Sequence, residues 1–114
     1  MLHSARKYLW DIYDSASFLI EDTRDSSLEE FLEDRRQISS ALHHLLIIGE
    51  SCRILRDRYP KIAAQIPEVS SAVGMRNVIA HEYTAVDYAL VWQTVRQNLE
   101  SLRERALMLY QETE

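Results

Sequence analysis

Apolar residues recur at alternating steps of three and four along most of this chain, and this spacing restricts it to helices. The first series is Leu2, Ala5, Leu9, Ile12, Ala16 and Leu19. A second series is Ile38, Leu42, Leu45, Ile48, Cys52, Leu55 and Tyr59. Residues three and four apart share one face of an α-helix, so each series predicts an amphipathic helix with one buried side. Only two glycines and two prolines interrupt the 114 residues. The chain is therefore expected to be all-α.

Turn signals divide the pattern into an antiparallel bundle of about four main helices, forming a single domain over residues 1–114. A first helix is predicted over residues 2–23, and a polar break and a short apolar anchor follow it. The long second helix ends before Pro60. A short helix over 61–65, a third main helix over 68–80 and a last helix reaching about residue 111 complete the bundle. The last helix begins either at a capping box of Thr84 and Asp87 or at Asp87 alone.

Charge and composition exclude several classes of protein. The formal net charge is -5 and the pI is near 5.3, which argues against broad electrostatic attraction to nucleic acid. A local basic cleft remains possible, since Arg53, Arg56, Arg58 and Lys61 cluster in sequence. The N-terminus lacks the apolar stretch of a signal peptide, and no apolar run approaches a membrane span. A soluble, cytoplasmic protein without membrane contact is expected.

No metal or cofactor site is predicted. His43 and His44 are adjacent, so they point to different sides of a helix, and no Cys, His and Asp spacing resembles a metal site. The single cysteine, Cys52, can form no internal disulfide and lies in an apolar helical register. We expect it to be a core thiol in a reducing cytosol.

The middle of the second helix is apolar on more than one face, because residues 45–48 are four apolar side chains in succession. Gly49 follows, at a cost of about 1 kcal/mol relative to alanine, which indicates the close approach of another backbone. Either this is the central helix of the monomer core, or it also contacts a second subunit; a homodimer is favoured. Glu50 is expected to form a structural hydrogen bond or salt bridge, because a carboxylate near a phosphate would repel it.

Residues 76–83 contain the candidate catalytic side chains. Arg76 is always a cation and His81 exchanges a proton near neutrality, so the segment holds both groups that phosphate chemistry needs. On a continuous helix, however, the two side chains diverge by about 140°. Either the helix ends before His81, or Arg76 of one subunit works with His81 of another. Both alternatives predict a site at the end of an element or at a dimer seam.

Three segments around this motif, residues 46–50, 74–77 and 86–92, together resemble the HepT-like branch of the HEPN superfamily. The resemblance covers nearly the whole chain. It implies a small helical bundle that cleaves RNA without metal, using an Arg-x4 to 6-His motif at a dimer cleft. Two departures stand out: residues 70–73 replace an expected tryptophan and isoleucine, and residues 44–46 replace an expected Asn-Leu-Glu.

By position, the resemblance implies that Arg76 and His81 are the catalytic pair, with Asn77 as their polar companion. His81 would act as general base or acid while the RNA 2′-hydroxyl attacks the adjacent phosphate, and Arg76 would stabilise the developing charge. Asn77 would orient His81 or the phosphate. The resemblance further implies the toxin of a toxin-antitoxin pair. Its antitoxin would be an MntA-like nucleotidyltransferase that silences it by AMPylation of Tyr83.

Two other functions fit the same residues. In the first, the chain is a non-catalytic, nucleotide-binding partner subunit of a minimal nucleotidyltransferase that presents Tyr83 for modification, and the acidic pI favours this. Alternatively it is a structural helical dimer in which Arg76 and His81 make only internal hydrogen bonds.

Overall fold

The computed structural model describes residues 4–113, and every regular element within this range is a helix. The elements are α1 (Ala5–Asp22), α2 (Leu28–Glu33), α3 (Arg35–Arg58), α4 (Pro60–Ala63), α5 (Val69–His81), the 3₁₀ turn η1 (Tyr83–Ala85), α6 (Tyr88–Gln97) and α7 (Leu99–Glu112). The predicted all-α bundle is confirmed. Leu2, predicted to begin the first helix, lies outside the described residues. None of the helices described here is both long and apolar enough to cross a membrane.

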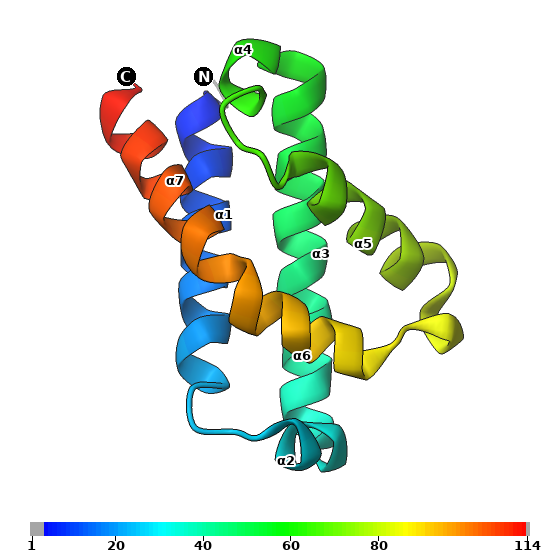
Figure 1. Cartoon of the computed structure of the whole chain (residues 1–114). Helices are drawn as coiled ribbons and strands as arrows, with labels where there is room; N and C mark the ends of the chain where they lie inside the picture. The colour runs from blue at the N-terminus through cyan, green and yellow to red at the C-terminus, as the bar shows by residue number, and fades with distance from the viewer. Residues whose placement is uncertain (1–3, 114) are drawn as a thin grey trace.

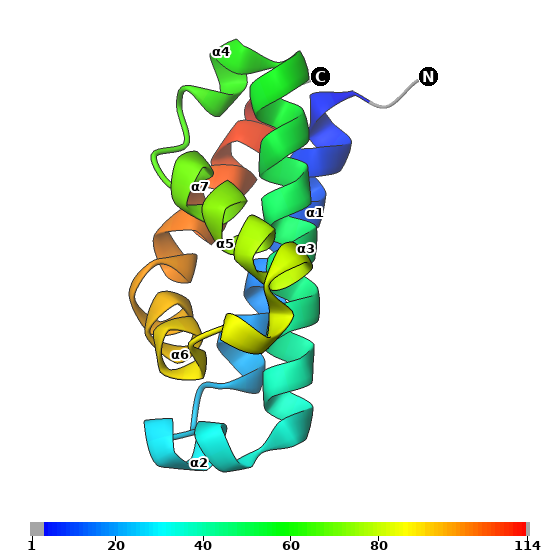
Figure 2. The ribbon, with the colours of Figure 1, turned by 90° about the vertical axis from the view of Figure 1, so that its right-hand side faces the viewer.

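The long helix α3 is the centre of the arrangement. It packs against α1 on one side and α5 on the other, and α7 packs along the opposite flank of α1 (Figure 1). A view turned by 90° shows α5, α6 and α7 on one side of the α1 and α3 pair (Figure 2). The short helix α2 closes one end of the bundle, against α3 and α6.

The predicted apolar seams form the core. From α1 the side chains of Leu9, Ile12, Ala16 and Leu19 are fully buried, and Val91 and Leu99 join them from α6 and α7. Cys52 is fully buried as expected, and burial raises the pKa of its thiol to about 12. A thiol with so high a pKa carries almost no thiolate at neutral pH, so Cys52 is a packing residue.

Side chains cap three of the helices. Ser27 accepts a hydrogen bond from the Glu30 amide while the Glu30 carboxylate accepts one from the Ser27 amide, which makes a capping box for α2. Asp34 caps α3. Asp87 alone caps α6 by accepting from the amides of Ala89 and Leu90, so the second of the two predicted starts is correct.

The continuous last helix predicted from the sequence is wrong. The chain breaks at Asn98 into α6 and α7. Asparagine is a poor interior helix residue because its side chain competes for backbone hydrogen bonds. The break changes the direction of the chain, so that α6 reaches α2 while α7 packs along α1. The apolar seam continues through it, since Val95, Leu99 and Leu102 are all buried.

Gly49 is the point where α5 crosses α3. A Cβ atom at position 49 would lie 2.2 Å from the Cβ of Arg76 and 2.7 Å from the carbonyl oxygen of Ala72. Both distances are shorter than any real contact, and both atoms belong to α5 of the same chain. The predicted close approach of another backbone is therefore confirmed, and the monomer core accounts for it.

Replacing Gly49 tests this contact. We expect Gly49→Ala to lower stability by about 1–3 kcal/mol, because the Cβ of Arg76 and the carbonyl of Ala72, whose positions the α5 backbone fixes, must move to admit the methyl group. The matched control is Gly74→Ala in α5, where no atom lies within 4 Å of an added Cβ. That change should stabilise the chain by about 1 kcal/mol through helix propensity alone. Thermal unfolding of the two variants measures both effects, and equal stabilisation by both would contradict the crossing described here.

Candidate active site

Arg76 lies on the face of α5 that packs on α3, directly over Gly49. Because glycine leaves room there, the stem of the arginine lies flat against α3 and its side chain is only 27% exposed. The buried residues Val69, Val73 and Ile79 hold this helix against the core. Of the residues 70–73 that depart from the resemblance, Val73 is buried in this contact.

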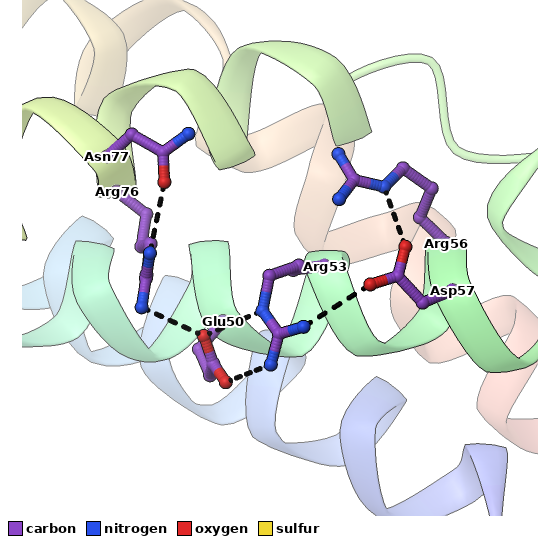
Figure 3. A network of polar contacts seen from close by, with 6 residues as sticks. All are labelled: Glu50, Arg53, Arg56, Asp57, Arg76 and Asn77. Atoms are coloured by element: carbon purple, nitrogen blue, oxygen red, sulfur yellow. Dashed lines mark hydrogen bonds and ion pairs between the residues drawn. The ribbon is translucent and has the colours of Figure 1, made fainter.

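The guanidinium of Arg76 is held from two sides (Figure 3). One nitrogen donates to Oδ1 of Asn77 at 3.0 Å, and the other lies 3.4 Å from a carboxylate oxygen of Glu50. Glu50 also accepts two hydrogen bonds from Arg53, at 3.2 and 2.6 Å. The bond from Arg53 is the main cause that holds the pKa of Glu50 below its usual value, and the charge of Arg76 adds to it. Glu50 thus makes the salt bridge expected of it, and its partners include Arg76.

His81 and Tyr83 lie apart from this network. His81 is the last residue of α5 and is exposed, so the helix does not end before it and that alternative is wrong. Tyr83 begins η1 and is 54% exposed. Across residues 4–113 we find no hydrogen bond or ion pair to either side chain. Asn77 pairs with Arg76 and not with His81.

One chain therefore brings Arg76, Asn77 and Glu50 together, but it presents His81 on a different side of α5. The remaining alternative, in which Arg76 of one subunit works with His81 of another, stays a prediction. Sequence analysis named Arg53 as part of a local basic cluster but did not pair it with Glu50. The spacing could have indicated this pairing, because Glu50, Arg53 and Asp57 are three and four residues apart and so share one face of α3.

The other sequence features lie elsewhere. His44 faces α1, where its Nδ1 is 3.0 Å from the Ser15 hydroxyl and its ring packs on Phe18, and burial lowers its pKa. A cavity of about 470 Å³ lies between α3, α5, α6 and α7, but none of the four predicted site residues lines it. Within the described residues no group of three His, Cys, Asp or Glu side chains gathers as a metal site would require.

Comparison with known proteins agrees with this fold and motif. A family model described as ribonuclease HepT-like matches residues 12–109. Because the match covers most of the chain, the chain belongs to this family of the HEPN superfamily. The predicted class, a HEPN-type ribonuclease, agrees with this membership. No solved structure matches the chain significantly.

Three curated relatives match along nearly their full lengths. "Putative RNase MJ1380" of Methanocaldococcus jannaschii is 29% identical over 87% of this chain and 90% of its own length. "Probable ribonuclease HepT" of Thermococcus cleftensis is 31% identical over 90% of this chain and 93% of its own. "Putative RNase TTE0752" of Caldanaerobacter subterraneus is 29% identical over 96% of this chain and 97% of its own.

The ion pairs of Glu50 should be visible in an acid titration. Because the pKa of Glu50 is lowered in the folded chain, its ion pairs stabilise the fold at pH values above the usual carboxyl pKa of 4.5. This stabilisation is lost as the pH falls through the lowered pKa of the folded chain. Side-chain carboxyl NMR should give a Glu50 midpoint below 4.5. Arg53→Ala should move the midpoint upward, whereas Arg105→Ala, a distant charge loss, should not. An unchanged midpoint in Arg53→Ala would contradict the network.

Proposed function

We propose that this chain is a metal-independent endoribonuclease and the cytoplasmic toxin of a toxin-antitoxin pair, acting as a homodimer. The observation that carries the proposal is the state of Arg76 in a chain of the ribonuclease HepT-like family. Its guanidinium is partly exposed, yet it is held in one place by the crossing at Gly49, by Glu50 and by Asn77. A preorganised cation of this kind suits a phosphate whose charge grows during reaction.

The proposed reaction is transesterification. The RNA 2′-oxygen attacks the adjacent phosphorus as its proton leaves, and the bond from phosphorus to the 5′-oxygen of the next nucleotide breaks as that oxygen gains a proton. The products are a 2′,3′-cyclic phosphate and a 5′-hydroxyl. His81 moves a proton as general base or acid, and Arg76 stabilises the phosphoryl oxygens. Since the nucleophile belongs to the substrate, the reaction needs no metal and should not cleave DNA.

A second copy of the chain supplies the missing half of the site in this proposal. Leu46 and Ile47 are half-buried and lie one turn before Glu50, so they continue its face of α3 in the direction away from Arg53. This apolar stripe beside the Arg76 network is a surface that a two-fold partner can cover with its own copy. Such a dimer would bring the partner's His81 toward Arg76.

A second candidate function is a non-catalytic partner subunit of a nucleotidyltransferase. The observation in its favour is that Tyr83 is exposed at the end of α5, where an enzyme of the MntA type could reach its hydroxyl. In this case the chain would present Tyr83 and would cut no RNA.

The nuclease activity is tested on single-stranded RNA in the presence of EDTA. The unaltered protein should cleave it and leave 2′,3′-cyclic phosphate ends. Arg76→Ala and His81→Ala should each lower the rate by about 100-fold or more while circular dichroism shows an unchanged fold. A substrate with one 2′-deoxy sugar should resist cleavage at that position. Full activity of both variants would show that the site assignment is wrong.

Mixing the two inactive variants tests the shared site. If Arg76 works with the other subunit's His81, a mixed dimer of Arg76→Ala and His81→Ala retains one intact site. Random mixing should then restore about a quarter of the unaltered rate, because half of the dimers are mixed and each has one of two sites. No recovery after exchange, confirmed by sedimentation of the mixture, would place both residues of each site in one chain.

AMPylation is tested at Tyr83. Groups added to its hydroxyl would place bulk and negative charge two residues from His81, blocking RNA by contact and by repulsion. With ATP and magnesium, an MntA-like partner should add multiples of the AMP mass to the peptide that contains Tyr83. Tyr83→Phe should stay active and escape silencing. Silencing of this variant as strong as that of the parent would mean that the partner inhibits by binding alone.

A further inference from the structure

Three arginines lie in a row along the line where α3 meets α5 (Figure 3). Arg76 is at one end, Arg53 is in the middle and Arg56 is at the other end. Carboxylates separate them: Glu50 lies between Arg76 and Arg53, and Asp57 accepts from Arg53 at 3.2 Å and from Arg56 at 3.1 Å. From the level of Gly49 to that of Arg56 the rise along α3 is about 10 Å. The row is thus long enough to contact phosphates of an RNA strand that lie next to the one that reacts.

The row is positively charged in an acidic protein. The guanidinium groups of Arg76, Arg53 and Arg56 outnumber the carboxylates of Glu50 and Asp57, whereas the whole chain has a formal net charge of -5. Lys61 lies just beyond Arg56 in sequence, is exposed and makes no ion pair within the described residues. A polyanion is therefore repelled by most of the surface and attracted at this line.

The ion pairs within the row are weak enough to exchange. Arg53, Arg56 and Asp57 have side chains that are 38%, 49% and 47% exposed. Pairs this exposed contribute about 0–1 kcal/mol, so a phosphate can replace Asp57 at small cost. Until then the carboxylates hold the guanidinium groups in position. Arginine side chains bind phosphate through two parallel hydrogen bonds. Since the ion pairs already restrain these guanidinium groups, the side chains lose little conformational entropy when a phosphate binds.

The far end of the row opens on a second feature suited to RNA. Arg56 lines a hollow of about 380 Å³ whose other walls include Pro60, Ala63, Ile66 and Pro67. Unstacked bases of single-stranded RNA stack on aromatic rings or on guanidinium planes, and Arg56 supplies such a plane at this hollow. A base beyond the cleavage site can lie there while its phosphate meets Arg56.

We propose that Arg53 and Arg56 form a binding track for the phosphates of single-stranded RNA that flank the cleaved bond, with Asp57 as a displaceable counter-ion. This inference rests on the proposed ribonuclease function and names how that site selects its substrate. Arg76 holds the reacting phosphate, and the strand continues over Arg53 toward Arg56. The track gives a strand longer than two nucleotides its affinity.

The experiment compares a dinucleotide with one phosphodiester to a single-stranded RNA of about twelve nucleotides. Arg56→Ala removes the arginine that does not contact Glu50, so it should raise KM for the longer RNA about fivefold without changing kcat. It should also reduce the slope of log KM against log salt by about 0.7 and leave cleavage of the dinucleotide unchanged. Arg53→Ala should likewise raise KM for the longer RNA. Asp57→Asn should have the opposite effect and lower KM for the longer RNA, because it removes a counter-ion from both arginines.

Arg105→Ala on α7 is the matched control, since it removes the same charge from a site away from the row and should leave KM unchanged. Equal KM values for the unaltered protein, Arg53→Ala and Arg56→Ala would overturn the track. So would a loss of dimer in sedimentation that accounts for the rise in KM, which would make the row a subunit contact. If the unaltered protein cleaves neither RNA, the proposed function itself fails, and this outcome is distinct from the others.

Discussion

The contact between α3 and α5 at Gly49 is the constraint on which the rest of the structure depends. It lets two backbones approach within the space that one methyl group would fill, and it places Arg76 flat on the central helix. The same crossing brings Arg76 within reach of Glu50, which is next to Gly49 in sequence. The same contact therefore packs the core and places the side chain proposed to be catalytic. A residue without a side chain positions the side chain proposed to bind phosphate.

Most of the fold could be predicted from the sequence because its signals are local. The seams of α1 and α3 follow from apolar spacing, and Ser27 and Asp87 start helices through hydrogen bonds to residues two or three positions away. The break at Asn98 could not be predicted in this way. The apolar seam passes through it without interruption, so spacing alone favours one helix. Both helices contact α1, but α6 also packs on α2 and α3, and this arrangement is a property of the assembled bundle.

The candidate site, like the fold, could be predicted where its signals are local and not where they join two helices. Arg76, Asn77, His81 and Tyr83 were found from eight adjacent residues, and their assignment as site residues stays a prediction. The pairing of Glu50 with Arg76 joins two helices, and no spacing within either of them reveals it. The carboxylate was expected to be structural because it repels phosphate. Its position beside Arg76 holds that cation, and a negative charge there also opposes any anion that approaches.

The position of Tyr83 has a consequence for how long the protein lasts. Its side chain projects from a three-residue turn and is more than half exposed, so none of the buried core depends on it. A group attached to it would leave the packed interior and its resistance to proteolysis unchanged. If Tyr83 is modified as proposed, the modified and unmodified chains should therefore resist proteolysis equally.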